Sequence, residues 1–402
     1  MEIAFFTDSY DPMKDGVAAV TGGLARTIVQ QGHSVRVYAP QTGADASVHD
    51  EVVGGVRIHR VRSLPVPLYS QYRWAIFPFD LLRHARGAGD ADVVHLHTPG
   101  PVGSIGFLAA RRFRRPLVGT FHTNIREMQS SVPRKLLIPL FFRVAWWYNL
   151  GTYWRCDAAT APSPSARDAL EHSARKPFRR PVSVVPNGID VDRFRPGASV
   201  PDWRSRCGLQ TGPLLTFLGR LTNDKGVHRF LDAVAEIAPT TDVSAIVGGR
   251  GPEEAAVRER LARDPVLRAH VRYVGPVAEE EKAALLGQSD LFVLPSTSDT
   301  SSVALLEAMA CGATVVAPAV GGAAEVVQDG ITGRRVDVLA PGALAATLRS
   351  LLDDTAERRR LSRQAIGWAR SHASLETMAQ RFISLYRMVE EERPPRADRS
   401  GL

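Results

Sequence analysis

Short runs of aliphatic and β-branched residues alternate with helix-length amphipathic stretches along most of this 402-residue chain. Apolar runs of this length, bounded by turn residues and separated by helices, predict the buried strands of parallel sheets with helical crossovers. In the first half the runs are IAFF, SVRVYAP, DVVHLH, PLVGTFH, AATAPS and VSVVPNG. The pattern restarts after NGIDVDRFRPGASVP with LLTFLGR, VSAIVGG, VRYVG, LFVLP and ATVVAPA.

The interruption near residues 189–212 is rich in Gly, Pro and Asp, which predicts a linker between two α/β domains. A chain of this length is also too long for one ordinary core. We therefore predict two Rossmann-like, doubly wound domains whose ligand-binding strand ends face a central cleft. The predicted parts are an N-terminal domain at 1–190, a C-terminal domain at 191–376, a helix at 377–392 packing back toward the N-terminal domain, and a disordered tail at 393–402.

Composition and charge limit the classes of partner. Apolar residues make up 44% of the chain and charged residues 23%, as in ordinary globular proteins. Lys and Arg outnumber Asp and Glu by 50 to 42, a net charge of +8. This excess suits an anionic partner such as a nucleotide diphosphate, acidic lipid headgroups or nucleic acid. The three cysteines lie far apart without CxxC spacing, so their pattern indicates neither a zinc site nor a disulfide framework. This pattern fits a reducing cytoplasm.

Two apolar segments bear on the membrane. The N-terminal MEIAFFTDSYDP reaches Asp8 after a short apolar patch, which predicts a first strand and not a signal peptide. The segment KLLIPLFFRVAWWYNL is interrupted by Pro139 and Arg143 and is too short to cross a bilayer. Its aromatic and basic composition suits a membrane interface, a helix packed in the first domain, or the rim of an acceptor pocket. We predict a cytoplasmic protein, in solution or peripheral at the inner face of the membrane.

Candidate ligand groups follow the strands of the first half. Gly16, in TDSYDPMKDGVAAV, lies at the expected start of a helix, where it is either a simple turn residue or an approach point for a phosphate. The spacing is not GxGxxG, which disfavours dinucleotide binding. His122 follows the strand PLVGT at its C-terminal end, where open α/β sheets place ligand groups. For His95 and His97 we expect opposite strand faces, and therefore structural hydrogen bonds without a shared metal.

In the second half, LGRLTNDKG places Arg220 and Lys225 after a strand. A guanidinium and an ammonium five residues apart are able to clamp a diphosphate, although such residues also commonly flank surface turns. The segment GGRGPEE predicts a strand-to-helix turn with Pro252 at the first helical position and acids near the helix N-terminus.

The stretch SDLFVLPSTSDTSSVALLEAMACGATVVAPA predicts strand, loop, helix, glycine stop and strand. Asp299 falls in the loop, Glu307 inside the helix, and Gly312 at its C-terminal stop. Acids beside so apolar a helix are costly unless they are paired or bind a ligand. Because carboxylates accept hydrogen bonds from hydroxyls, we expect these two acids to hold a polyol such as a sugar or a ribose.

With these motifs in order, residues 1 to about 390 resemble a retaining glycosyltransferase of family 4, which has the two-domain GT-B fold. The resemblance implies an enzyme that moves a sugar from a UDP- or GDP-sugar to a hydroxyl of a lipid-linked or glycan acceptor, usually without a bound metal, and no other cofactor is expected. It also implies that the N-terminal domain at 1–190 binds the acceptor and that the C-terminal domain at 191–376 binds the nucleotide sugar. The matching segments are FFTDSYDPMKDGV, DVVHLHTPGPVG, GTFHTNIRE, VVPNGIDVDRF, GRLTNDKG, GGRGPEE, VLPS, DTSSVALLEAMACGATVVA and GGAAEVVQDGITG.

The resemblance also implies roles for individual residues. Arg220 and Lys225 would neutralise the donor diphosphate that Gly16 approaches. Asp299 and Glu307 stand at the two acids of the family's E-x7-E motif and would contact the transferred sugar and the ribose. The implied catalytic residues are His122, Arg220, Lys225 and Asp299, and the implied substrate-binding residues are Gly16, Asn187, Gly251, Ser301, Ser302 and Glu307, with no metal ligand.

Two departures from the family pattern leave the transferred sugar open. Asp299 is one methylene shorter than the usual Glu, and Ser301 and Ser302 replace the usual Phe-Gly. Other functions also remain open at this point: transfer to a soluble small-molecule acceptor in natural-product biosynthesis, epimerisation of a sugar nucleotide, or silent sugar-nucleotide binding. Nucleic-acid binding is not expected, because the basic runs form no recognised module.

Overall fold

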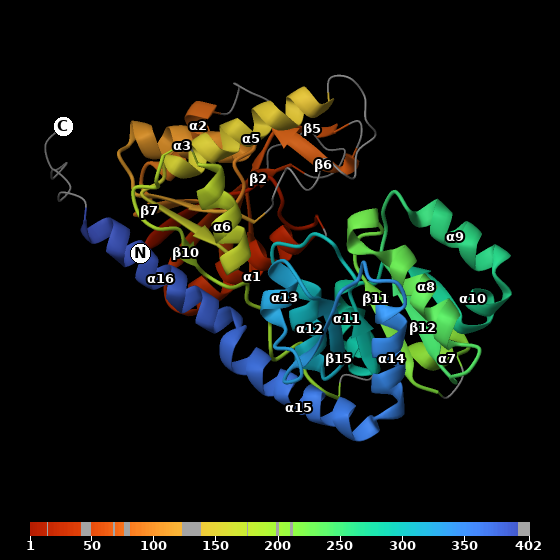
Figure 1. The fold of residues 1–402 in the computed structure, drawn as a ribbon. Coiled ribbons are helices and arrows are strands. Elements are labelled where there is room, and N and C mark those ends of the chain that lie inside the picture. The colour runs from red at the N-terminus through yellow and green to blue at the C-terminus, as the bar shows by residue number, and fades with distance from the viewer. Residues whose placement is uncertain are drawn as a thin grey trace, which may run out of the picture. The chain divides into compact units, whose positions relative to one another are not determined.

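The computed structural model describes the chain in nine segments, which form two compact units, each treated by itself below. The first unit lies within Met1–Ile125, Leu136–Gly188 and Leu375–Leu402, and the second within Ile189–Ser374. The predicted tail at 393–402 and the part of the aromatic segment before residue 138 lie outside the described residues. Figure 1 shows the elements, and the described residues are 1–13, 15–41, 50–66, 69–75, 81–122, 138–174, 176–197, 201–209 and 212–392.

An eight-stranded sheet in the order β10-β9-β8-β7-β1-β2-β4-β3 forms the centre of the described part of the first unit. Its neighbouring strands are parallel except β3 and β4, and β5 and β6 form a separate antiparallel pair. The strands are β1 (Glu2–Phe6), β2 (Ser34–Pro40), β3 (Asp50–Val53), β4 (Val56–Val61), β5 (Ser63–Val66), β6 (Tyr69–Ala75), β7 (Val93–Leu96), β8 (Leu117–Thr120), β9 (Ala158–Ala161) and β10 (Ser183–Val184).

Helices cover both faces of this sheet. Phe6 packs with α2 and α3 residues on one face, while Phe5 on the other face contacts His95, whose ring packs against Phe382 of α16. The C-terminal helix α16 also packs on α1 (Figure 1), where a Cβ on Gly23 would lie 2.8 Å from Leu375. The helices are α1 (Gly16–Gln30), α2 (Leu81–Ala88), α3 (Pro101–Arg112), α5 (Ile138–Trp154), α6 (Pro164–Ser173) and α16 (Leu375–Glu391).

The second unit has a six-stranded, all-parallel sheet over its described residues, in the order β13-β12-β11-β14-β15-β16. Its strands are β11 (Leu214–Leu218), β12 (Ser244–Gly248), β13 (Val271–Gly275), β14 (Leu291–Val293), β15 (Thr314–Pro318) and β16 (Gly333–Val336). Its helices are α7 (Trp203–Cys207), the short η2 (Asn223–Lys225), α8 (Val227–Ile237), α9 (Glu254–Arg263), α10 (Pro265–His270), α11 (Glu279–Gly287), α12 (Val303–Cys311), α13 (Gly322–Val326), α14 (Ala343–Asp353) and α15 (Thr355–His372).

The structure confirms parallel α/β sheets in both halves, but two local expectations were wrong. The segment 189–212 is not a plain linker, because α7 forms within it and Phe194 and Trp203 are buried in the core of the second unit. Pro252 is not the first helical residue, because α9 is capped at Glu253 and begins at Glu254. Among the described helices, none combines the length and the apolar character needed to span a bilayer.

Candidate active site

In the first unit, three neighbouring strands, β8, β7 and β1, carry polar side chains just beyond their carboxyl ends. Asp8 follows β1, and its carboxylate accepts hydrogen bonds from Thr98 Oγ1 at 2.7 Å and from the backbone N–H of Val102 at 2.9 Å. Burial raises the pKa of Asp8, and these hydrogen bonds oppose that rise. Asp8 therefore joins the β1 turn to the start of α3, a role that the sequence reasoning missed.

Glycines make this close approach possible. A Cβ on Gly100 would lie 2.4 Å from an Asp8 carboxylate oxygen, and one on Gly103 would lie 1.9 Å from the Thr98 carbonyl. Such distances are shorter than real contacts, so any larger residue would push the turn apart. The TPGPVG segment is thus explained by packing around Asp8.

Gly16 is the first residue of α1, as the sequence predicted. Asp15 is the N-cap of this helix, and its carboxylate accepts a hydrogen bond from the Ala18 N–H at 2.9 Å. Ser9 Oγ donates to the same carboxylate at 2.5 Å. The helix end expected to approach a diphosphate therefore already carries one negative charge, which partly offsets the helix dipole.

The histidines of β7 lie together, and the expectation of opposite faces was wrong. The His95 and His97 rings are 4.0 Å apart, because residues two apart in a strand point to the same side. His95 lies 2.7 Å from both Tyr386 Oη and Thr120 Oγ1, and Thr120 continues to Thr160 at 2.7 Å. A structural, hydrogen-bonded role for His95 is confirmed.

His122 lies just past β8 and is buried, with Nε2 3.1 Å from Nδ1 of His97. Burial lowers the pKa of His122 to about 4 and that of His97 well below its ordinary value, so both rings are neutral near pH 7. Nε2 of His97 is buried with no hydrogen-bond partner in the described residues. A proton on that nitrogen would be an unpaired buried donor, so the arrangement favours His97 donating from Nδ1 to His122.

Asn187 also belongs to the first unit, at its boundary with the second. Its side chain is 6% exposed, and its Oδ1 is a buried acceptor without a partner among the described atoms. The next residue, Gly188, donates its N–H to Met378 Sδ at 3.1 Å, which ties this segment to α16.

In the second unit, the adjacent strands β12, β11 and β14 end near the remaining predicted residues. Lys225 ends the short helix η2 after β11, and its Nζ lies 2.8 Å from Oδ2 of Asp299. Their side chains are only 17% and 10% exposed. Gly226 has φ +78°, and a Cβ there would lie 2.1 Å from the Pro295 carbonyl, so glycine lets this turn reach the β14 end.

Arg220 is partly exposed in the turn that follows β11, and its guanidinium has no carboxylate partner within the part of the second unit that the structure describes. Gly251 packs against the same turn: a Cβ on it would lie 2.2 Å from the Leu221 carbonyl, which accepts the Glu253 N–H at 3.0 Å. Gly251 therefore has a structural function in holding the β11 and β12 turns together.

The 299–302 loop is fixed at both of its ends. The Asp299 carbonyl accepts the Gly322 N–H at 2.9 Å, and a Cβ on Gly322 would lie 2.0 Å from the Thr300 carbonyl. Ser302 is the N-cap of α12, and its Oγ accepts from the Leu305 N–H at 3.4 Å. Ser301 is partly exposed next to this cap. Gly312 ends α12 in the left-handed conformation, with φ +93°, as predicted.

Glu307 lies within α12 and is 4% exposed. Its carboxylate lies 3.7 Å from Lys282 Nζ, and Lys282 in turn lies 2.5 Å from Glu279 on α11. Burial raises the pKa of Glu307, opposed by Lys282. Burial alone would lower the pKa of Lys282, but Glu307 and Glu279 outweigh it and raise that pKa. The buried acid is thus paired through a lysine that sequence reasoning missed, since 25 residues separate the partners (307 − 282).

The structure therefore joins Lys225 with Asp299 and seats Glu307 against Lys282, each within the second unit. In the same described residues, no group of three or more His, Cys, Asp or Glu side chains is arranged to hold a metal ion. Two acids and two lysines at the carboxyl side of one parallel sheet are suited to hydroxyl and phosphate ligands.

Comparisons with known proteins agree over nearly the whole chain. Residues 14–193 match the family described as "Glycosyltransferase Family 4", and residues 201–368 match "Glycosyl transferases group 1". The chain is 30% identical over 361 residues to the GDP-mannose-dependent alpha-mannosyltransferase of Mycolicibacterium smegmatis, covering 90% of each protein. It is 28% identical over 324 residues to the alpha-monoglucosyldiacylglycerol synthase of Streptococcus pneumoniae, covering 79% of this chain and 71% of that protein.

A solved structure, Anabaena Alr3699/HepE in complex with UDP, superposes with a TM-score of 0.77 at 21% identity, over 96% of this chain and 100% of that one. At this identity the likeness concerns the fold alone. It confirms the predicted fold class, GT-B with two Rossmann-like domains.

Proposed function

The chain belongs to glycosyltransferase family 4, and we propose that it moves a sugar from a UDP- or GDP-sugar to a hydroxyl of a lipid-linked or glycan acceptor, with retention at the anomeric carbon. The observation that carries this proposal is the pairing of Lys225 with Asp299 at the ends of β11 and β14. A cation for a phosphate and an acid for a sugar hydroxyl are thereby held 2.8 Å apart.

Lys225 and Arg220 are proposed to stabilise the leaving nucleotide. As the glycosidic bond to the diphosphate breaks, negative charge grows on the departing phosphate oxygen. Cations fixed at that position stabilise the charge without having to reorganise, and they act more strongly in a site with little water. Lys225 is 17% exposed and its turn is fixed by Gly226, which supports such a preorganised role. The proposal needs no bound metal or other cofactor.

Asp299 and Glu307 are proposed to hold the hydroxyls of the donor. Asp299 reaches Lys225 with one oxygen and leaves its second carboxylate oxygen to accept from the transferred sugar. Glu307 is held by Lys282 and is proposed to accept from the ribose hydroxyls. Sharing Asp299 between a lysine and a sugar would couple sugar binding to the position of the phosphate-binding cation.

In the first unit, His122 is proposed to act on the acceptor side. Its ring is neutral, and hydrogen bonding from His97 Nδ1 to His122 Nε2 places the His122 proton on Nδ1. A neutral imidazole N–H is able to donate to a sugar or acceptor oxygen without bringing a charge into the site.

The acceptor and donor classes are supported by the relatives. The S. pneumoniae relative is named as a glucosyldiacylglycerol synthase and the M. smegmatis relative as GDP-mannose-dependent. We propose a membrane lipid as the acceptor and therefore a peripheral location at the inner face of the membrane. A soluble small-molecule acceptor, a sugar-nucleotide epimerase and a silent binding protein are the outcomes that the test below separates.

The test is nucleotide release from UDP-, GDP- and dTDP-sugars with EDTA present, with and without a membrane lipid extract. The proposal predicts release of one nucleotide that requires lipid and continues in EDTA. Conversion of a donor to an isomeric nucleotide sugar without acceptor would instead identify an epimerase. Tight donor binding with no release from any lipid or small-molecule acceptor would contradict transfer.

A further inference from the structure

Helix α5 (Ile138–Trp154) of the first unit is unusual because, between the exposed Arg143 and Arg155, its described outer face carries no charged side chain. No charged residue lies between Arg143 and Arg155, and the buried stripe contains Trp146, Leu150 and Tyr153. A surface helix normally presents polar residues to water on the opposite side. Here the opposite stripe is also apolar and exposed, with Val144 60%, Trp147 37%, Tyr148 47% and Trp154 37% exposed.

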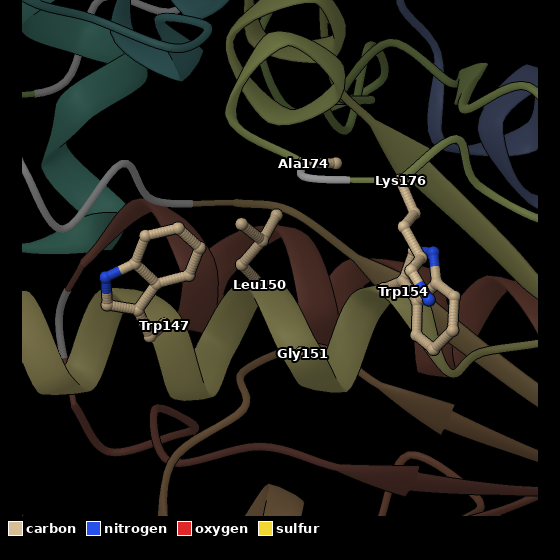
Figure 2. A pocket seen from close by; sticks show the side chains of 6 residues that line it. All are labelled: Trp147, Leu150, Gly151, Trp154, Ala174 and Lys176. Carbon is tan, nitrogen blue, oxygen red and sulfur yellow. The ribbon is translucent and has the colours of Figure 1, made fainter.

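The exposed indole rings of Trp147 and Trp154 border a hollow. Figure 2 shows Trp147 and Trp154 at its two ends along α5, with Leu150 between them and the Lys176 side chain reaching toward Trp154. The indole N–H of Trp154 donates to the Pro177 carbonyl at 3.0 Å. That bond satisfies the polar edge of the ring and fixes its orientation. The Arg155 guanidinium lies over the same ring, 5.7 Å from its centroid, so a cation and an exposed aromatic face are presented together.

Cations surround the same aromatic side chains. Arg111, Arg155 and Arg179 line a second hollow that shares Trp154. Arg111 donates to the Arg155 carbonyl at 2.6 Å and Arg155 to the Gly151 carbonyl at 2.8 Å, so these bonds leave both charges unneutralised. The acid in this hollow, Asp157, is occupied by Arg179 at 3.1 Å and by the Leu117 N–H at 2.9 Å.

We propose that this aromatic–basic face, made of Val144, Trp147, Tyr148, Trp154, Arg111, Arg155 and Lys176, docks on an anionic lipid bilayer. Trp and Tyr rings prefer the headgroup region, where an apolar body and a polar edge are both accommodated. Exposed Lys and Arg beside them gain from the negative surface potential of the leaflet. Charge complementarity thus selects an acidic lipid surface as the occupant, and the inference rests on the proposed transfer to a membrane lipid.

The first measurement is the partition of the full-length protein onto vesicles of phosphatidylcholine alone or with about one third phosphatidylglycerol. Binding is expected on the anionic vesicles and is expected to weaken steeply as salt rises, since the attraction decays within a Debye length. Brominated lipids should quench tryptophan fluorescence, and this quenching should fall in Trp147→Phe/Trp154→Phe. Failure of the wild-type protein to bind anionic vesicles at low salt would overturn the inference.

Two pairs of substitutions separate the apolar and electrostatic contributions. Trp147→Ser/Trp154→Ser is expected to lower the partition coefficient roughly tenfold or more. Arg111→Gln/Lys176→Gln is expected to lower it roughly fivefold per cation at low salt. The Arg111→Gln change keeps a side-chain donor for the Arg155 carbonyl, so the second pair preserves folding even if the first pair does not.

Matched controls are available on the second unit. Val320→Ser/Leu339→Ser removes two apolar side chains that are 71% and 69% exposed, and Arg359→Gln/Arg363→Gln removes two exposed cations. The controls should partition like the wild type. Equal loss in the controls and in the aromatic–basic face would overturn the inference, because binding would then not depend on where the substituted side chains lie.

Sedimentation and nucleotide release bear on the proposal in two further ways. If sedimentation shows a dimer that dissociates in the Trp variant while vesicle binding is unchanged, a second copy of the chain occupies the face and the proposal is overturned. Failure of vesicle binding and failure of sugar transfer can be told apart, because vesicle partition requires no catalysis. Variants that lose vesicle binding but keep nucleotide release with a detergent-dispersed lipid acceptor support both proposals.

Discussion

Lys225 Nζ and Asp299 Oδ2 lie 2.8 Å apart in a region where both side chains are largely buried. The cation expected to meet the donor diphosphate and the acid expected to meet the transferred sugar are therefore one ion pair. Removing either member leaves a poorly hydrated charge without its partner, which costs more than the pair itself contributes. Substitutions at these positions consequently report on both binding and preorganisation.

Lys225→Ala is expected to lower turnover sharply. Loss of a positioned cation at a developing oxyanion typically lowers turnover by about 100-fold to 1,000-fold, and we expect at least the lower figure here. The decrease should equal or exceed that of any acid substitution near the sugar. The measurement is kcat for nucleotide release at saturating donor, with Arg229→Ala as a control for loss of a neighbouring charge. Near-normal turnover would remove Lys225 from the leaving-group role.

Asp299→Glu restores the longer acid of the family pattern and is expected to change donor choice more than donor affinity overall. The extra methylene would extend the carboxylate further into the proposed sugar site, while the loop stays fixed through the Gly322 N–H bond to the residue 299 carbonyl. The measurement is kcat/KM for a panel of nucleotide sugars with wild type and variant. An unchanged order of preference would show that this residue does not select the sugar.

Gly251→Ala should destabilise the second unit by about 2 kcal/mol or more, because its Cβ would meet the Leu221 carbonyl at 2.2 Å and the turn would have to shift. Gly219→Ala is the matched control, since a Cβ there has open space. Urea unfolding of both variants measures the difference. Equal stability of the two variants would place the importance of Gly251 in ligand contact instead of turn packing.

The buried histidines make stability depend on pH. The pKa of His122 is lowered from its ordinary 6.5 to about 4 by burial, and burial also lowers the pKa of His95 and of His97. A depressed folded pKa contributes stability that is present above the unfolded pKa and is lost as pH falls toward the folded one. For His122 alone, the loss between pH 6.5 and 4 is about 3 kcal/mol.

Thermal or urea unfolding between pH 7 and 4 measures this effect on the first unit. His97→Asn keeps a group able to donate to His122 Nε2 but removes one titrating ring, so it should flatten the acid side of the stability curve. His172→Asn, on the exposed end of α6, is the control substitution. If the stability of His97→Asn fell between pH 7 and 4 as steeply as that of the wild type, the proposed contribution of His97 to the pH dependence would be contradicted.

The strands that the sequence predicted best are those buried on both sides, such as SVRVYAP, which matches β2 residue for residue. Strands β3 to β6 were also missed. The edge strand β3, DEVV, is mostly exposed and carries no apolar run, whereas β4, VRIHRV, is largely buried but has apolar residues only at alternate positions until its end. The opposite-face error for His95 and His97 came from the wrong strand period, not from the sequence. The helix that contains Glu307 and its two caps were predictable, because Ser302 and Gly312 are local signals.

The partners of the predicted site residues were not predictable. Asp299 meets Lys225 across 74 residues, and Glu307 meets Lys282 across 25, and neither separation leaves a pattern in one sequence. Asp15 as the cap of α1 was within reach, because an Asp directly before a predicted helix start is a recognised N-cap signal. Position and chemistry alone marked Gly16, His122, Arg220, Lys225, Asp299 and Glu307 as candidates. Their roles came from a family resemblance and stay predictions until the experiments above are made.

Following the sugar itself tests the central claim most directly. With the donor that supports nucleotide release, labelled with ¹³C at the anomeric carbon, the lipid extract is incubated with the enzyme in EDTA and the products are separated. Mass spectrometry and the anomeric coupling constants should show one hexose added to a lipid hydroxyl per nucleotide released, with the configuration of the donor preserved. Label that remains entirely in nucleotide sugars or free sugar, or a product of inverted configuration, would contradict the account.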